Sequence, residues 1–252
     1  TRVFILSVKF LTWMRKPVDL TYRLPGQQHI LQESAFNYII KVREKNLGEE
    51  IMGYSVAIDG PAGAGKSTIA KRVAKEKDFI YIDTGAMFRA MAIHFLRCGI
   101  AADDHEKISE AVKDVNVTIS YVNGEQNVFL NGENVTGQLR TEEVGNMASA
   151  SSVNGDVRKK LLELQRKLAA SANVVMDGRD IGTVVLPDAD VKVYLTASVE
   201  VRAQRRYKEL IEKGQEADLE KIKKDIEERD YRDMNRDIAP LRQAEDAILV
   251  DS

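Results

Sequence analysis

The stretch GPAGAGKS, Gly60 to Ser67, decides the fold of this 252-residue chain. It fits the pattern G-x-x-x-x-G-K-[ST] at every defined position, with the apolar run YSVAID before it and a helical pattern after it. Glycines let the backbone turn tightly enough for its N–H groups to enclose a phosphate, and the start of the helix adds a partial positive charge. The stretch therefore predicts a phosphate-binding loop between a strand and a helix.

Each polar position of this loop has an expected task. In a nucleoside triphosphate site of this kind, the Lys66 ammonium reaches the β- and γ-phosphates and the Ser67 hydroxyl ligates Mg²⁺. The motif does not say what accepts the phosphoryl group. The residues predicted to bind the triphosphate are Gly60, Pro61, Ala62, Gly63, Ala64, Gly65, Lys66, Ser67 and Thr68.

Beyond the loop, short apolar runs alternate with helical stretches, which is the pattern of a parallel α/β sheet. Buried strands are expected at residues 54–58, 79–82, 173–176, 191–195 and 247–250. Between the second and the third, apolar and polar residues alternate, and the pairs Asn123-Gly124 and Asn131-Gly132 are strong hairpin signals. The sequence thus predicts an α/β core with a small antiparallel meander inserted into it.

Composition limits the partners that the chain can have. Its net charge of -2 argues against a nucleic-acid binder, which normally carries a clear basic excess. The most apolar terminal run, residues 3–13, is interrupted by Lys9 and is shorter than the ~20 residues of a membrane span. The single cysteine, Cys98, fits a reducing compartment. We therefore expect a cytoplasmic protein with no nucleic-acid or membrane partner.

Charged residues gather where the second and third predicted strands end. The segment YIDTGAMFR contains Arg89, and the segment VVMDGRDIGTVV contains Arg179 and Asp180. Ligands of open α/β sheets bind beyond the carboxyl ends of the strands, so both segments should face the crevice that holds the phosphate loop. A surface ion pair is the alternative for either arginine alone. Two such places at one crevice favour the binding of an anion.

The stretch ERDYRDMNRD, Glu228 to Asp237, continues a helix whose apolar residues step by three and then four along residues 219–226. That stripe marks the buried face, and the same steps lead to Arg229, Asp233 and Arg236. Burying an unpaired charge costs several kcal/mol, and a single aspartate cannot balance two arginines. The inward excess of positive charge predicts an anionic ligand.

The other charged residues near this helix are less specific. Asp230, Arg232 and Asp237 fit a solvated face. An arginine cluster after the fourth predicted strand leaves two interpretations open, namely a solvated helix face or a mobile flap that closes on the triphosphate. Its members are Arg202, Arg205 and Arg206.

Five blocks, IDGPAGAGKST, DTGAMFR, LRTEEV, DGRDIGTVVLPDA and ERDYRDMNRDIAPL, together resemble the bacterial cytidylate kinases of the nucleoside monophosphate kinase group. The resemblance covers residues 52–252. It implies a P-loop kinase core with a five-stranded parallel sheet flanked by helices, at residues 53–102 and 151–252. It also implies an inserted antiparallel β nucleotide-binding domain at about 103–150 and a short lid at about 201–217. The implied reaction transfers the γ-phosphoryl group of ATP to CMP or dCMP, with Mg²⁺.

The resemblance also implies roles for individual residues. Lys66 and several arginines would stabilise the transferred phosphoryl group, and Arg205 in the lid would contact ATP. Ser149, Arg158 and Asp180 would read the base, because a carboxylate paired with a guanidinium distinguishes cytosine from uracil. The implied catalytic residues are Lys66, Arg89, Arg179, Arg229 and Arg236. The implied CMP-binding residues are Thr84, Arg89, Ser149, Arg158, Arg179, Asp180, Arg229, Asp233 and Arg236.

Two features depart from the family's pattern. Residues 1–51 have no counterpart, and they are interpreted either as sequence upstream of a natural start at Met52 or as a poorly ordered extension. The chain stops at AILVDS, where the family continues into a final helix, so the sheet is expected to expose some apolar surface.

Alternative functions stay open at this point. One is a P-loop kinase acting on another nucleoside monophosphate or on a small metabolite, which would lack the Arg158 and Asp180 pair. The other is a nucleotide-dependent switch that binds ATP without consuming it in the presence of CMP. For the kinase interpretation, a monomer is expected.

Overall fold

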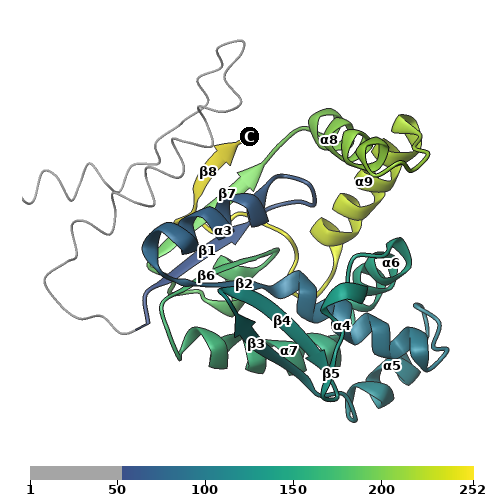
Figure 1. Ribbon diagram of the computed structural model, residues 1–252, viewed down its shortest axis with the longest axis horizontal. Helices are drawn as coiled ribbons and strands as arrows, with labels where there is room; N and C mark the ends of the chain where they lie inside the picture. The colour runs from purple at the N-terminus through teal and green to yellow at the C-terminus, as the bar shows by residue number, and fades with distance from the viewer. Residues whose placement is uncertain (1–52) are drawn as a thin grey trace, which may run out of the picture.

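A computed structural model describes residues 53–252, so the interpretation of residues 1–51 falls outside the described part. Five parallel strands form one sheet in the order β2-β6-β1-β7-β8 (Figure 1). The five predicted strands are confirmed, with bounds that move by no more than two residues. They are β1 Ser55–Asp59, β2 Ile80–Asp83, β6 Val174–Gly178, β7 Val191–Thr196 and β8 Ile248–Asp251.

Helices connect these strands and flank the sheet (Figure 1). Most of them begin at a side chain that accepts a hydrogen bond from the first turn, as Asp218 does for the N–H groups of Glu220 and Lys221. The helices are α3 Lys66–Lys77, α4 Thr84–Arg97, α5 His105–Val112, α6 Glu142–Ser151, α7 Gly155–Ala169, α8 Val199–Glu212 and α9 Leu219–Asn235, with short turns at Thr136–Gln138 and Ile181–Val185. No helix within residues 53–252 is long and apolar enough to cross a membrane.

The sheet is buried on both faces, because successive side chains of a strand point to opposite sides. In β1, Val56 and Ile58 belong to a core shared with α3, while Ala57 belongs to a second core shared with α4 and α7. Both faces are apolar, which is why the strands read as continuous apolar runs in the sequence.

The inserted meander is a separate antiparallel sheet in the order β3-β4-β5, formed by Val117–Val122, Glu125–Leu130 and Glu133–Asn134. Both Asn-Gly pairs lie at its turns, and all four residues have positive φ angles, from 49° to 88°. Asn and Gly tolerate this left-handed conformation better than other residues. The hairpin prediction is therefore confirmed.

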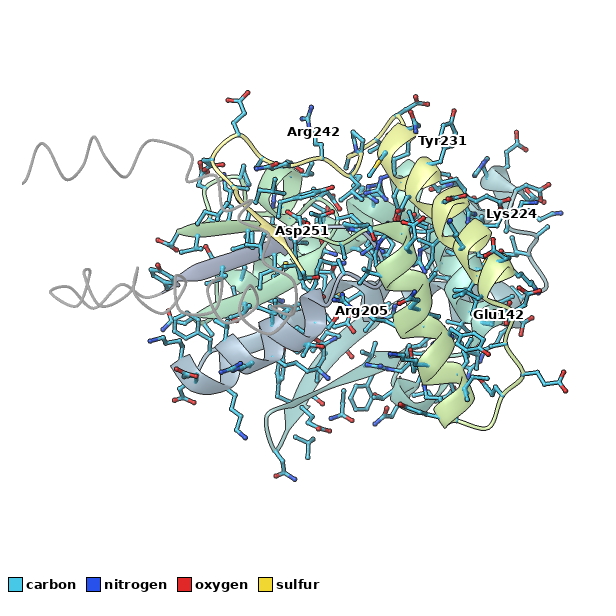
Figure 2. The ribbon with its side chains drawn as sticks, turned by 90° about the horizontal axis from the view of Figure 1, so that it is seen from above. Glu142, Arg205, Lys224, Tyr231, Arg242 and Asp251 are labelled. Carbon is cyan, nitrogen blue, oxygen red and sulfur yellow. The ribbon has the colours of Figure 1, made fainter. Side chains whose placement is uncertain are left out.

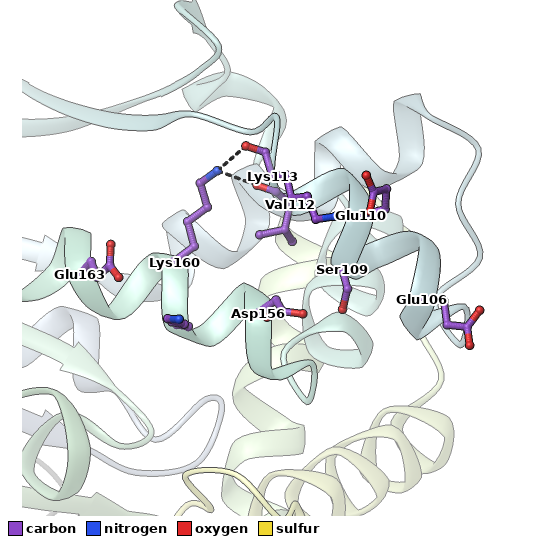
Figure 3. A pocket seen from close by; sticks show the side chains of 9 residues that line it. Glu106, Ser109, Glu110, Val112, Lys113, Asp156, Lys160 and Glu163 are labelled. Carbon is purple, nitrogen blue, oxygen red and sulfur yellow. Dashed lines mark hydrogen bonds and ion pairs between the residues drawn. The ribbon is translucent and has the colours of Figure 1, made fainter.

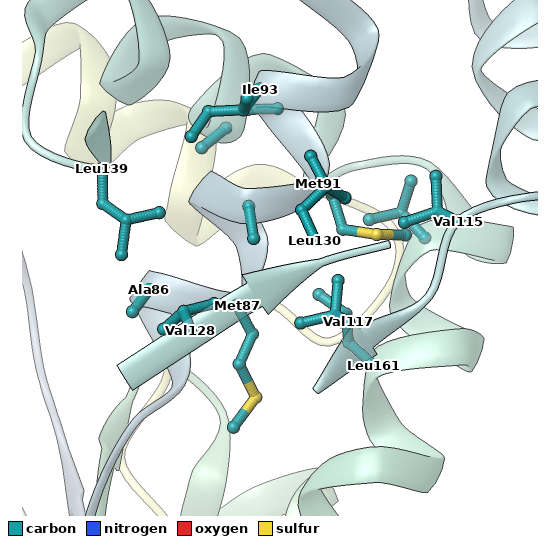
Figure 4. Close-up of a cluster of buried hydrophobic side chains, with 14 of the residues drawn as sticks. Ala86, Met87, Met91, Ile93, Val115, Val117, Val128, Leu130, Leu139 and Leu161 are labelled. Atoms are coloured by element: carbon teal, nitrogen blue, oxygen red, sulfur yellow. The ribbon is translucent and has the colours of Figure 1, made fainter. Parts of the chain in front are cut away.

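The meander has no hydrophobic core of its own. Its Val128 and Leu130 join Met87 and Met91 of α4 and Leu161 of α7 in one continuous cluster (Figure 4). This packing fixes α4 between the insert and the sheet. The amino end of α4 is consequently held rigidly at the carboxyl end of β2.

Helices α8 and α9 lie side by side next to the phosphate loop, with Arg205 on α8 and Tyr231 on α9 (Figures 1 and 2). The predicted apolar stripe of α9 is only half-buried, because this helix packs mainly against α8. Its charged continuation faces the interior as predicted, since Asp233 and Arg236 are buried.

Candidate functional site

A cavity of about 260 Å³ lies beyond the carboxyl ends of β1, β2 and β6. The phosphate loop forms one side, and the start of α4, helix α6, the segment after β6 and the end of α9 form the others. The predicted site residues that line it are Ala62, Gly63, Lys66, Ser67, Thr84, Arg89, Ser149, Arg179, Asp180, Arg229, Asp233 and Arg236. The fold thus joins the predicted triphosphate side and the predicted acceptor side.

The backbone of the phosphate loop depends on its glycines. Gly60 has a φ of 145°, and a Cβ atom there would lie 1.9 Å from the carbonyl oxygen of Leu195. Gly63 and Gly65 also have positive φ angles. The remaining residues predicted to bind the triphosphate do not line the cavity; Gly60, Pro61, Ala64 and Gly65 form the turn, and Thr68 lies in the first turn of α3.

The first turn of α3 is prepared for an anion. Its N-cap residue is Gly65, and no side chain caps it, whereas each of the other described α-helices has a capping side chain. The buried Lys66 donates a hydrogen bond to the carbonyl oxygen of Pro61 over 2.7 Å. Burial, together with the nearby Arg179, lowers the pKa of Lys66 to about 7. Bound phosphates would supply the missing negative charge.

Asp177 is a site residue that the sequence reasoning did not single out. Its carboxylate accepts hydrogen bonds from Ser67 Oγ over 2.8 Å and from Tyr81 Oη over 2.9 Å. Burial raises the pKa of Asp177. The available signal was its place at the end of β6, beside β1, where phosphate-loop proteins commonly carry a metal-binding aspartate.

Arg158 and Asp180 form a buried ion pair over 2.5 Å. Arg158 also donates to the carbonyl oxygen of Ser152 and lies 5.5 Å from the ring centroid of Phe88. The helical pattern alone suggests an exposed position for Arg158, whereas the structure buries it behind the cavity wall. Nearby, the buried Ser149 Oγ has no hydrogen-bond partner among the described residues and is available to a ligand.

Asp233 joins two arginines from different segments. It accepts a hydrogen bond from Arg179 Nε over 2.9 Å, and its other oxygen lies 3.6 Å from Arg236. Helix α9 ends at Asn235, and Arg236 has an extended backbone, with a φ of -70° and a ψ of 144°. The inward position of Arg236 therefore depends on the helix end as well as on the helical period that predicted it.

Arg229 differs from its neighbours, since no ion pair with it is found among the described residues. The close contact with the Asp233 carboxylate comes from Arg179 and not from Arg229. Its buried Nε has no partner in the described part of the chain. Burial, followed by the proximity of Arg179, lowers the pKa of Arg229 to about 10. This arginine is the clearest candidate to meet a ligand anion.

Arg89 enters the cavity from α4 and forms an ion pair with Asp83 over 3.2 Å. The backbone of Asp83 is itself held by Gln126 of the meander, whose side chain accepts its N–H and donates to its carbonyl oxygen. Sequence reasoning missed Gln126, because this contact joins residues 43 positions apart. The insert thereby fixes the turn that carries Thr84 and Arg89.

Two interpretations of the α8–α9 region are wrong. Asp230 is not on a solvated face but is buried and paired with Arg202 over 2.6 Å. Arg202 is not on a solvated helix face either, because it is buried and also donates to the carbonyl oxygen of Ala62. Arg205 lies outside the cavity and contacts Ser252 Oγ, which in turn donates to the carbonyl oxygen of Ala64.

A larger hollow of about 500 Å³ lies between α5 and α7 (Figure 3). Carboxylates and lysines line it together, so that no single sign of charge dominates. Its Lys160 donates to the carbonyl oxygens of Val112 and Lys113 and so caps the end of α5. Its residues serve the packing of these helices.

Comparisons with known proteins agree with this geometry. The family model described as cytidylate kinase matches residues 56–252. A protein named cytidylate kinase from Leuconostoc mesenteroides is 51% identical over 199 residues, covering 79% of this chain and 89% of that protein. Another of that name, from Caldicellulosiruptor saccharolyticus, is 50% identical, with coverages of 79% and 88%.

A solved structure, described as the crystal structure of TT1252 from Thermus thermophilus, covers 80% of this chain and 90% of its own. Its sequence identity is 16% and its TM-score 0.38, which is too low to support an argument. The family model and the two relatives are decisive, because each covers more than three quarters of the chain. This chain belongs to the cytidylate kinase family.

Proposed function

We propose that this chain transfers the γ-phosphoryl group of ATP to CMP or dCMP, which gives ADP and CDP or dCDP. The observation that supports it is that the phosphate loop and four arginines, Arg89, Arg179, Arg229 and Arg236, line one cavity, with the buried Arg158–Asp180 pair beside it. The alternative acceptors, another nucleoside monophosphate or a small metabolite, are less favoured, because the relatives carry the name cytidylate kinase.

The donor nucleotide binds on the phosphate-loop side. Backbone N–H groups at the start of α3 and the Lys66 ammonium meet the β- and γ-phosphates in this proposal. Ala62 and Gly63 line the cavity beside them. For Arg205 in the lid to contact ATP, its hydrogen bond to Ser252 must first break.

The residues present fit a Mg²⁺ ion. Ser67 Oγ and the Asp177 carboxylate are hard oxygen donors that already lie 2.8 Å apart at the cavity wall. These two residues would hold the ion through their oxygens, together with phosphate oxygens of the substrate. When bound, the ion would neutralise charge that develops on the phosphate oxygens.

The acceptor nucleotide binds on the side of the cavity that faces the phosphate loop. Arg179, Arg229 and Arg236 surround the position of its phosphate, with Thr84 and Arg89 beside them. Asp233 orients two of these arginines and is placed to contact the pentose. Ser149, Arg158 and Asp180 read the base, because cytosine presents an amino donor next to acceptor atoms that a carboxylate and a guanidinium match.

The mechanism requires alignment rather than covalent catalysis. The chain orients an oxygen of the acceptor phosphate toward the γ-phosphorus, and this positioning replaces a random bimolecular encounter. Lys66 and the arginines stabilise the charge on the equatorial oxygens of the transferred group. Closure of the lid over the bound nucleotides would exclude water, which otherwise competes as the acceptor.

A panel of nucleoside monophosphates, each incubated with Mg-ATP, tests this function. The expected result is ADP formation that depends on CMP or dCMP and is much slower with AMP, GMP or UMP. Preferential turnover of AMP would overturn the cytosine assignment. ATP binding without any acceptor-dependent ADP formation would instead favour the nucleotide-dependent switch.

The remaining expectations belong to the same proposal. The division into core, inserted nucleotide-binding domain at about 103–150 and lid at about 201–217 assigns acceptor recognition to the insert and ATP closure to the lid. The proposal also includes a monomeric state and a cytoplasmic location for the enzyme. Sedimentation at the assay concentration tests the monomer.

A further inference from the structure

Asp59 is a buried carboxylate that the proposed reaction does not use. It is the last residue of β1, it is 4% exposed, and Gly60 of the phosphate loop follows it. Its two oxygens accept the backbone N–H groups of Ile181 and Gly182, over 2.8 Å and 2.7 Å. Asp59 therefore joins the end of the donor-side strand to the segment that carries the acceptor-side residues.

These two N–H groups open the short helical turn Ile181–Val185, whose N-cap residue is Asp180. An aspartate at an N-cap normally turns its own carboxylate toward the N–H groups of the first turn. Here Asp180 makes no such bond. Its carboxylate instead contacts Arg158 over 2.5 Å and Arg236 over 3.5 Å.

We propose that Asp59 is a positioning residue for acceptor recognition, because it caps the turn after Asp180 and so leaves the Asp180 carboxylate free to hold Arg158 and face the base. The inference rests on the proposed function, since the base contact is part of that proposal. Without the two acceptor oxygens of Asp59, the turn loses its cap, and the backbone that carries Asp180 is no longer tied to the end of β1. The Asp180 carboxylate then loses its fixed position beside Arg158 and the cavity.

The backbone of residues 178–182 has little room to move. A Cβ atom at Gly182 would lie 3.1 Å from Lys192 Cδ and 3.4 Å from Asp59 Oδ2. A Cβ atom at Gly178 would lie 2.6 Å from Ile181 Cδ1. The backbone from residue 178 to 182 is thus packed tightly on both sides. The loss of Asp59 is therefore expected to act on the position of Asp180, which begins the same turn.

Burial raises the pKa of Asp59 to about 6, although the two N–H groups and Lys66 oppose the increase. At pH 8 the group is therefore ionised, and both oxygens are acceptors. Assays at pH 8 compare this carboxylate directly with the neutral amide of Asp59→Asn, which offers a single acceptor oxygen and places an NH₂ group against the second N–H.

The test is a double-mutant cycle on base selectivity at pH 8, with Asp59→Asn, Asp180→Asn and the double variant. The ratio of kcat/KM for CMP to that for UMP is expected to fall about tenfold in Asp59→Asn, the scale of one lost hydrogen bond to a charged group. The double variant should be no less selective than Asp180→Asn alone, because Asp59 acts through Asp180. Two results would overturn the inference. One is a CMP-to-UMP ratio in Asp59→Asn equal to that of the wild-type protein, and the other is a loss of selectivity in the double variant equal to the product of the two single losses.

Asp190→Asn is the matched control. Its carboxylate accepts hydrogen bonds from the N–H and the hydroxyl of Ser55, at the other end of β1. This variant loses the same kind of contact with the same strand, and its CMP-to-UMP ratio should stay at the wild-type value. An equal fall in selectivity in Asp190→Asn would show that Asp59 acts only through general stability. If Asp59→Asn does not fold, Asp59→Glu displaces the cap by one methylene group and should lower the ratio as well.

A crystal structure of the ligand-free Asp59→Asn variant gives a readout that does not depend on turnover. The 181–185 turn should have moved away from residue 59, and the distance between the Asp180 carboxylate and Arg158 should exceed its present 2.5 Å. An unchanged Arg158–Asp180 pair would refute the positioning role even if the chain proved to use another acceptor. Absence of CMP phosphorylation by the wild-type protein would instead refute the proposed function, so the two failures are distinguishable.

Discussion

The two sides of the cavity are built in different ways. On the donor side, one continuous stretch, Gly60 to Ser67, forms the phosphate loop, and its shape depends on backbone conformations and close contacts. On the acceptor side, single side chains converge from α4, α7, α9 and the segment after β6. The donor side is a local backbone structure, whereas the acceptor side is an assembly of charges.

This difference has an energetic consequence. On the acceptor side, five arginines face three carboxylates, those of Asp83, Asp180 and Asp233. A nucleotide phosphate supplies the missing negative charge, so the ligand-free protein holds positive charge at some cost to its stability. The donor side holds a single buried lysine, which can lower that cost by losing its proton. Substitutions on the two sides should therefore affect activity and stability differently.

Removal of the Lys66 ammonium should have the largest effect on turnover. Lys66→Ala is expected to lower kcat by about 10²- to 10³-fold, the usual result when a main stabiliser of transition-state charge is deleted. The melting temperature should change little, because within residues 53–252 the ammonium group makes a single hydrogen bond, to the carbonyl oxygen of Pro61, and burial of its charge is itself unfavourable. Steady-state ADP formation and thermal unfolding measure the two quantities. Near-normal turnover would remove the donor side from the proposed site.

Lys75→Ala is the control on the same helix, since Lys75 is exposed in the last turn of α3. Turnover of this variant should equal that of the wild-type protein. A comparable loss in both variants would mean that the stability of α3, and not the ammonium group, limits activity.

Substitution of Arg229 should have a smaller effect on turnover and the opposite effect on stability. Arg229→Met is expected to lower kcat/KM for CMP about 10- to 100-fold, because a charged hydrogen bond to the acceptor is lost. Its melting temperature should stay the same or rise, since a buried charge without an ion pair is replaced by an apolar side chain of similar length. Kinetics at saturating ATP and thermal unfolding test both expectations.

Arg232→Met is the matched control for Arg229. Arg232 lies three residues further along α9 and is exposed. Arg232→Met should change neither kcat/KM for CMP nor the melting temperature. A large loss of stability in Arg229→Met with unchanged kinetics would mean that Arg229 is a structural residue, and the acceptor side would then resemble an ordinary ion-pair network.

The same contrast explains what the sequence could predict. The loop between β1 and α3, the five strands and the Asn-Gly turns follow from neighbouring residues, and each is confirmed as an element of the fold. The inward direction of Asp233 and Arg236 also followed from the helical period. These features depend on interactions between positions a few residues apart, which a pattern in the chain records directly.

Pairing between distant segments could not be predicted in this way. Asp230 looked like a solvated residue, yet Arg202 pairs with it from another helix. The contact of Gln126 with Asp83 and that of Asp59 with Ile181 join residues 43 and 122 positions apart. No periodic signal marks such contacts, because a carboxylate or an amide of the same type is also common on a solvated surface.

The pH dependence of ATP binding should give the smallest effect and the sharpest distinction between the two sides. The pKa of Lys66 is about 7 in the free protein, and bound phosphates should raise it. Below pH 7 the Lys66 ammonium is already present, so its titration should change the affinity for ATP little. Above pH 7 binding must also supply a proton, so affinity should fall by up to about tenfold per pH unit until the pKa of the complex is reached.

Calorimetry of metal-free ATP at pH 8, in two buffers of different ionisation enthalpy, measures this proton directly. Metal-free ATP is chosen because a bound cation would also draw on the buried Asp177 carboxylate beside Ser67. The wild-type protein should take up nearly one proton per ATP, and Lys66→Met should take up none. Arg229→Met should still take up the proton, because the acceptor-side arginines keep their charge at pH 8. Proton uptake that persists in Lys66→Met would assign the titration to another group. The donor side would then hold a fixed charge, as the acceptor side does. The two sides would differ only in that one continuous segment forms the donor side, whereas distant segments form the acceptor side.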